Sequence, residues 1–233
     1  MLCFPRNGAS MPKSSINVAT AAFDRSYSRG YSAANRDHLD QLRRALHQTD
    51  PNDRPAPDAL TREAAVLVPI IERDGDLNIV FIRRSDIVES HRGQVAFPGG
   101  RVDPVDTTLL DTALREAREE VGIEREIVDV LGGFPTMSTV SSGMRVAPFV
   151  GVLTQSVDYK IDPIEVAQVF EVPLKVLADA RYRGLYEWRR EKDRPSSNFP
   201  AIFYSGQTIW GLTLRITESL LEIMQIARPN KAP

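Results

Sequence analysis

Two apolar, β-branched runs of strand length, at residues 64–71 and 77–83, constrain the fold of this 233-residue chain more than any other feature. Asp74 and Gly75 lie between them, and this pair favours the tight turn of a β-hairpin. Further strand patterns follow, whereas helical spacing recurs in only a few segments. The repeated strand–helix–strand units of dinucleotide-binding folds are not seen. The sequence therefore predicts an α/β fold in which a mixed sheet lies between helices.

The chain is expected to divide into three parts. Residues 1–34 are rich in small and polar residues without periodicity, and we expect a disordered or extended leader there. Residues 35–58 are expected to form an N-terminal helix, with Asn35 as its N-cap, and a linker rich in proline and aspartate. The folded domain is expected over residues 59–228. Its strand patterns lie at 94–97, 127–134, 145–153, 182–188 and 201–206, and its helical patterns at 106–121 and 209–227.

Composition argues against several classes of protein. The formal net charge of −2 gives no basic footprint for nucleic acid. No apolar run approaches the ~20 residues that span a bilayer. With Cys3 as the single cysteine and three histidines, neither a disulfide framework nor a structural zinc site is expected. We expect a cytoplasmic protein with neither nucleic-acid nor membrane partners, and the sequence allows a homodimer without determining one.

Acidic side chains crowd one flank of the helix predicted at residues 106–121. Glu116, Glu119 and Glu120 are spaced i, i+3 and i+4, and like charges at this spacing destabilise an isolated helix by about 0.2–0.5 kcal/mol per pair. A divalent cation reverses the sign of this interaction, because hard cations such as Mg²⁺ prefer oxygen ligands. Arg115 limits the repulsion in the absence of metal and can orient a neighbouring carboxylate. From this helix alone, a solvated face with a few salt bridges is the commoner explanation.

A Pro-Gly-Gly corner at residues 98–100 precedes the acidic helix. A loop of this kind can bring backbone N–H groups near an anion. Alone it is merely a turn. Together, the corner and the carboxylates indicate the two halves of a metal-assisted phosphate site.

Residues 115–123, REAREEVGI, resemble the second half of the Nudix hydrolase motif, G-x5-E-x7-R-E-U-x-E-E-x-G-U, in which U is a bulky apolar residue. Ala117 is small for the first U position. The front half of the motif has one residue too many between its glycine and the helix. Thr107 consequently falls where the motif has its first glutamate, and Asp106 is the nearest acid.

The segment upstream of the helix is similar to the signature of the coenzyme A pyrophosphatases, whose motif carries the same kind of extra residue. That signature reads roughly L-L-T-x-R-[SA]-x3-R-x3-G-x3-F-P-G-G. The chain reads IRRSDIVESHRGQVAFPGG at residues 82–100 and supplies Arg84, Ser85, Gly93, Phe97, Pro98, Gly99 and Gly100. The likeness covers roughly residues 64–220. Glu89 stands where the signature has its second arginine, and this charge reversal puts the substrate in doubt.

The resemblance implies a Nudix-like α/β/α sandwich with a mixed β-sheet, and a pyrophosphatase that depends on Mg²⁺ or Mn²⁺. It implies that Glu116 and Glu120 bind the metal, and that Glu119 is a third ligand or the group that activates water. For a coenzyme A pyrophosphatase, the small-molecule substrate is coenzyme A or a derivative. The products are then 3′,5′-ADP and 4′-phosphopantetheine or its acyl form.

Outside this set of glutamates, Glu165, Arg84 and His91 each allow two interpretations, whereas Arg115 has one expected role. Arg115 is placed with the catalytic groups, as an orienting residue. Glu165, an acid outside the motif, is either the catalytic base or a structural residue. Arg84 and His91 either contact the substrate or are an exposed strand arginine and a structural histidine. We expect substrate contacts from Arg84, His91, Gly99 and Gly100.

Two other functions stay open at this point. Glu89 motivates the first, a Nudix hydrolase of another nucleoside diphosphate derivative such as ADP-ribose. The second is a non-catalytic Nudix-fold protein that senses a nucleotide. The complete R-E-x-x-E-E set at residues 115–120 argues against the second, because a silent member would be free to lose those acids.

Overall fold

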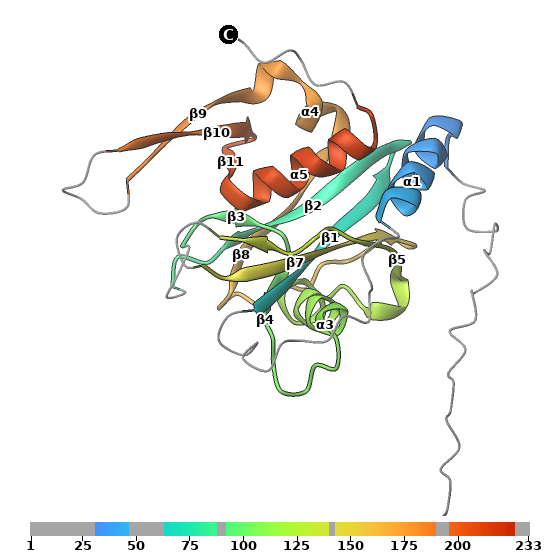
Figure 1. The fold of residues 1–233 in the computed structure, drawn as a ribbon, viewed down its shortest axis with the longest axis horizontal. Helices are drawn as coiled ribbons and strands as arrows, with labels where there is room; N and C mark the ends of the chain where they lie inside the picture. The colour runs from blue at the N-terminus through green and yellow to red at the C-terminus, as the bar shows by residue number, and fades with distance from the viewer. Residues whose placement is uncertain (1–30, 47–62, 88–91, 140–142, 190–195, 227–233) are drawn as a thin grey trace, which may run out of the picture. The chain divides into compact units, whose positions relative to one another are not determined.

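The computed structural model describes residues 31–46, 63–87, 92–139, 143–189 and 196–226. Within these ranges the chain forms an eight-stranded sheet, a three-stranded sheet and four α-helices (Figure 1). The helices are α1 (Ala33–Leu46), α3 (Leu109–Val121), α4 (Leu174–Ala178) and α5 (Gly211–Ile223). In this described part of the chain, none of the helices combines the length and apolar character that crossing a membrane requires.

The predicted hairpin is present in the middle of the large sheet. It consists of β1 (Glu63–Arg73) and β2 (Asp76–Arg84), which pair antiparallel. Asp74 and Gly75 both adopt positive φ angles, 52° and 82°, as an Asp-Gly turn between twisted strands requires. Most side chains of both strands are buried, so the hairpin supplies much of the core.

The large sheet is mixed, as predicted. Its main path runs β3–β2–β1–β7–β5, and three further strands pair with β1, β7 and β2. The strands not yet bounded are β3 (Val95–Ala96), β4 (Gly99–Arg101), β5 (Val128–Gly133), β6 (Met137–Ser138), β7 (Arg145–Leu153) and β8 (Val166–Pro173). The pairing of β1 with β7 is parallel, and the other pairings of this sheet are antiparallel.

Helices lie on both faces of the large sheet. Figure 1 shows α3 on one face, and α1 and α5 on the other. The buried side of α3 packs on apolar side chains of β1, β2 and β7 and thereby closes the main core. The observed architecture is therefore an α/β fold with helices on either side of a mixed sheet, in agreement with the prediction.

The first helix begins earlier than the sequence suggests. Asn35 is not the N-cap, because α1 starts at Ala33 and the hydroxyl of Ser32 accepts the N–H of Asn35 at 3.1 Å. The side chain of Asn35 instead donates to the carbonyl of Gly75 at 2.9 Å and holds α1 against the β1–β2 turn. Residues 1–30 of the expected leader and residues 47–58 of the expected linker lie outside the described residues.

Two other helices are shorter than predicted at their N-terminal ends. Asp106 precedes α3, because Thr108 and Asp111 form a capping box that starts the helix at Leu109. The last helix was expected from residue 209, but Ile209 and Trp210 belong to β11 (Gln207–Trp210). The C-terminal end of α3 agrees with the prediction, since Gly122 takes the left-handed conformation with φ of 72°.

The second sheet is small and shares no strand with the first, although β11 contacts β3. Its strand order is β11–β10–β9, with β9 at Arg183–Trp188 and β10 at Ser197–Tyr204, so the predicted pairing of these two segments is confirmed. Ile202 and Ile209 lie on the face of this sheet that α5 contacts, and both are fully buried. In Figure 1, β9 and β10 extend away from the large sheet.

The contact between α1 and β5 predicts that Gly132 cannot be replaced by a residue with a side chain without loss of stability. At Gly132, where φ is 139°, a Cβ atom would lie 2.5 Å from the carbonyl oxygen of Leu46. Gly132→Ala is expected to destabilise the fold by about 2 kcal/mol or more. Gly206→Ala is the control, because φ is 78° there but no atom lies within 4 Å of the added Cβ; its expected cost is about 1 kcal/mol. Equal urea midpoints for the two variants would contradict the proposed contact.

Candidate functional site

Strand β4 lies directly against the acidic helix, and two of its positions leave no room for a side chain. At Gly99, where φ is 154°, a Cβ atom would lie 2.4 Å from the carbonyl oxygen of Ala65. At Gly100 it would lie 2.4 Å from the carboxylate of Glu116. Both glycines pair with β1. The Pro-Gly-Gly corner is thus the place where the sheet backbone and α3 meet most closely.

Glu120 is the most buried acid of the helix, with 2% of its side chain exposed. The N–H of Gly99 donates to Oε2 at 2.9 Å, and Nη1 of Arg84 contacts Oε1 at 3.5 Å. The backbone carbonyl of Glu120 accepts the N–H of Asp162 at 3.0 Å. One carboxylate therefore joins α3 to β2 and β4, which lie far from it in the sequence.

Arg115 organises two further acids of the helix. Its guanidinium donates to both oxygens of Asp106 at 2.9 Å, and the Asp106 side chain is 2% exposed. The hydroxyl of Thr112 donates to the same carboxylate at 2.8 Å. Nη1 of Arg115 then donates to Glu116 at 3.0 Å and to Glu119 at 2.9 Å. Asp106 fixes the guanidinium, and the guanidinium fixes the two glutamates.

Three carboxylates converge in front of β4. One oxygen from each of Glu116, Glu120 and Glu165 lies within 4.8 Å of the other two. Glu165 is exposed and comes from the turn before β8, where its carbonyl accepts the N–H of Ser85 at 2.8 Å. Such a set of oxygen donors suits a hard divalent cation that completes its coordination with water or phosphate.

Burial and mutual repulsion make this group of acids reluctant to ionise together. Burial raises the pKa of Glu120 to about 8, against the N–H of Gly99 and the charge of Arg84, which lower it. Burial also raises the pKa of Glu116, against the neighbouring Arg115. The negative charge of Glu165 raises both values further. A cation between the acids would remove both causes of instability, because it supplies the missing positive charge.

The structure brings some of the predicted site residues together and leaves others outside the acid group. Glu116 and Glu120 come together as expected, and Glu165 joins them from outside the motif. Glu119 lies outside this group, is 57% exposed and pairs with Arg115. Arg84 contacts Glu120, and the N–H of Gly99, expected near an anion, donates to the same glutamate. His91 and Glu89 lie outside the described residues.

Asp106 was not among the predicted site residues. In the sequence it is only the acid nearest to the position of the motif's first glutamate. Asp106 lies nine residues before Arg115 in the sequence, and this spacing alone does not predict their contact. The contact depends on the turn between Asp103 and Asp106, which brings the carboxylate back to the helix.

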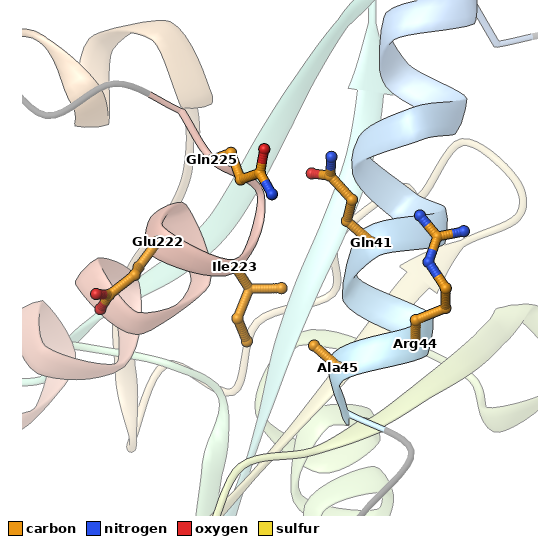
Figure 2. Close-up of a pocket in the computed structure, with 6 residues that line it drawn as sticks. All are labelled: Gln41, Arg44, Ala45, Glu222, Ile223 and Gln225. Atoms are coloured by element: carbon orange, nitrogen blue, oxygen red, sulfur yellow. The ribbon is translucent and has the colours of Figure 1, made fainter.

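A hollow in the described surface contains none of these acids. It lies between α1 and α5, has a volume of about 520 Å³ and appears in Figure 2. Gln41 and Gln225 extend toward each other across it, with Ile223 below them (Figure 2). Among its six lining residues Glu222 is the sole acid and no histidine is present, so the hollow offers no group of metal ligands.

Comparison with known proteins gives a consistent result. A model of the NUDIX domain matches residues 61–189. The chain is 41% identical over 171 residues to the uncharacterized Nudix hydrolase NudL of Yersinia pestis, an alignment that covers 72% of this chain and 82% of that protein. NudL of Yersinia pseudotuberculosis matches equally well. Among solved structures, the Nudix hydrolase RenU from M. smegmatis matches with a TM-score of 0.49 and 16% identity, over 73% of this chain and 91% of RenU.

The Asp106–Arg115 pair predicts that a buried ion pair contributes far more to the stability of the fold than an exposed one. Asp106→Asn is expected to cost about 2–4 kcal/mol of stability, because it removes the buried carboxylate that accepts two hydrogen bonds from the guanidinium. The control is Glu124→Gln, which removes the exposed partner of Arg118, where the side chains are 58% and 66% exposed; its expected cost is below about 1 kcal/mol. Urea unfolding measures both. Similar losses in the two variants would mean that Asp106 does not fix Arg115.

The raised pKa of Glu120 predicts how the metal-free protein depends on pH. The ordinary pKa of a glutamate is 4.5, and that of folded Glu120 is about 8. Between these values the unfolded chain releases the proton and the folded chain keeps it, so stability falls as the pH rises from about 4.5 to about 8. Glu120→Gln should reduce this fall and raise the Tm near pH 8 by several degrees, with little effect near pH 5.

This pH dependence is measured by thermal unfolding in the presence of a chelator across the same range. Glu124→Gln, at an exposed site, is the control and should follow the unchanged protein. Identical pH profiles for the unchanged protein and Glu120→Gln would show that Glu120 ionises normally and that its burial is not as described.

Proposed function

Because the chain belongs to the NUDIX domain family and is a Nudix hydrolase, we propose that it hydrolyses the diphosphate bond of coenzyme A or one of its derivatives. The observation that carries the chemistry is the convergence of Glu116, Glu120 and Glu165 in front of β4, with oxygens within 4.8 Å of one another. The similarity of residues 82–100 to the coenzyme A pyrophosphatase signature supports the substrate. The products are 3′,5′-ADP and 4′-phosphopantetheine, or its acyl form.

Nudix hydrolases generally use divalent metal ions, and the acids of this chain suit Mg²⁺ or Mn²⁺. Glu116 and Glu120 would hold the ion, with Glu165 near enough to supply a third oxygen. When bound, the ion would polarise the phosphoryl oxygens and lower the pKa of a bound water. The hydrogen bond from Gly99 and the contact with Arg84 keep Glu120 in one orientation before anything binds, so little reorganisation is needed.

Arg115 acts through the acids that it touches. With Asp106 on one side and Glu116 and Glu119 on the other, it holds two carboxylates at set positions on α3. Its positive charge also favours the ionised form of Glu116. Arg115 is therefore a positioning residue, and Asp106 is part of the same arrangement.

The attacking water needs a group that takes its proton, and we assign this role to Glu165. Glu119 accepts a hydrogen bond from Arg115 at 2.9 Å and does not join the three converging acids. One oxygen of Glu165 lies within 4.8 Å of oxygens of Glu116 and Glu120, beside the place where the metal and its bound water would be held. Glu165→Gln should therefore lower kcat more than Glu119→Gln does.

Arg84 is the side chain of the site best suited to meet the diphosphate. Its guanidinium is 22% exposed and lies 3.5 Å from Glu120. Once a cation neutralises Glu120, the arginine is available to a phosphate oxygen, to which a guanidinium donates readily.

A second substrate class has one observation in its favour. Glu89 stands where the coenzyme A signature has an arginine, and an acid there would repel an anionic part of coenzyme A. A nucleoside diphosphate derivative such as ADP-ribose is the alternative. The complete acid set favours either hydrolase over a non-catalytic nucleotide sensor.

The proposed function predicts metal-dependent release of 3′,5′-ADP from coenzyme A. Purified protein is incubated with coenzyme A and Mg²⁺ or Mn²⁺, and the products are separated by chromatography. Glu120→Gln should lower turnover by about 100-fold or more, because it removes a charge where the metal would bind. Glu124→Gln, which neutralises an exposed glutamate three residues after the end of α3, is the control and should retain turnover.

Two results would contradict this proposal. A higher kcat/KM for ADP-ribose than for coenzyme A would assign the site to the second substrate class. Undiminished turnover in Glu120→Gln would show that the acid cluster is not the reactive site.

A further inference from the structure

Strand β9 is an outer edge of the three-stranded sheet. It pairs with β10 residue by residue from Arg183 to Trp188, and in the described residues β10 is its one strand partner. In Figure 1 the β9–β10 ribbon extends away from the large sheet. The outer side of β9 thus presents a row of backbone N–H and C=O groups that can pair with another strand.

This edge lacks several of the features that usually prevent strand pairing. Its sequence, RGLYEW, contains neither proline nor lysine, and its register with β10 runs without a bulge. Leu185, in the middle of the strand, is 66% exposed. Strand β11 pairs with residues 201–204 of β10, so residues 197–200 of β10 have β9 as their one strand partner in the described structure. A two-stranded segment of this kind has little stability of its own, so an additional strand on this edge would stabilise it.

The same ribbon carries an aromatic face. The rings of Tyr186, Trp188 and Phe199 surround Trp210, with centroids 5.0 to 5.7 Å from its ring. All four side chains are only half-buried, and helix α5 contacts the opposite face of the sheet, where Ile202 is buried. Tyrosine and tryptophan in such positions are typical of the centres of protein interfaces.

We propose that β9 pairs antiparallel with β9 of a second copy of this chain, around a two-fold axis through Leu185. Residues directly opposite each other in an antiparallel pair lie on the same face. In this register Leu185 meets Leu185 of the second copy, and Gly184 meets Tyr186. The two small sheets join into one continuous sheet.

Charge is the reason for choosing a second copy over another protein. Arg183 and Glu187 lie two residues before and two residues after Leu185. The two-fold axis therefore places Arg183 of each copy opposite Glu187 of the other copy. Glu187 is 64% exposed and has only a loose contact of 3.7 Å with Arg189. Arg183 donates to Glu218 and to the carbonyl of Leu177, and its side chain stays 23% exposed. Glu187 of the second copy would lie opposite Arg183, so one strand supplies both charges of a self-complementary interface.

Leu185 provides a direct test, because in this register each copy meets its own residue at the axis. Leu185→Lys and Leu185→Glu each place two like charges opposite each other, and each should weaken self-association by about 100-fold. A mixture of the two variants places lysine opposite glutamate and should restore the dimer. Analytical ultracentrifugation over a range of concentrations measures all three samples and the unchanged chain. Val105→Lys, which alters a residue that is 75% exposed and outside β9, is the control and should stay dimeric.

Three results would overturn the proposal: a monomeric unchanged chain at tens of micromolar, dimers of both charged variants, or no association in the mixture. Circular dichroism confirms that the variants are folded, which the exposure of Leu185 favours. The proposal is independent of the hydrolase chemistry, since β9 contributes none of the acids. Loss of the dimer with retained turnover would therefore leave the proposed function intact, and loss of turnover alone would leave the dimer intact.

Discussion

Mutual repulsion of carboxylates is the constraint on which the rest of the site depends. Three acids bring oxygens within 4.8 Å of one another, one of them on a side chain that is 2% exposed. Without compensation such a group would be costly to bury. The chain compensates with an N–H from Gly99, a guanidinium from Arg84 on one side and another from Arg115 on the other. These groups reduce the repulsion only in part, since burial still raises the pKa of Glu120 to about 8.

The same compensation explains why the site needs parts of the chain that are far apart. Strand β1 holds β4 through Gly99 and Gly100, and this brings the glycine backbone to the acids of α3. Strand β2 carries Arg84 to the same place, and the turn before β8 brings Glu165. The core beneath α3 fixes the helix against the sheet. The packing of the core therefore also fixes the geometry of the site. A shift of α3 would move its glutamates away from Gly99, Arg84 and Glu165.

Local sequence signals predicted much of the fold. The Asp-Gly turn, the strands on either side of it and the glycine at the end of α3 are local features, and all three are present. The starts of the helices were less predictable. Trp210 fits a helical pattern as well as a strand, and only its pairing with Ala201 on β10 decides for the strand. Asn35 resembles an N-cap in sequence, but Ser32 holds that position and Asn35 binds the carbonyl of a distant turn.

The sequence by itself determined which residue types lie on the acidic helix and which family the chain resembles, because both depend on spacing along one segment. Only the tertiary structure decided which acids meet. Glu119 lies next to Glu120 in the chain but pairs with Arg115, whereas Glu165, 45 residues further on, joins Glu120. Only the tertiary structure brought Asp106 to Arg115 and gave the N–H of Gly99 to a glutamate. The physical reason is that contacts across a fold depend on strand register and helix packing, and no spacing within a single segment contains that information.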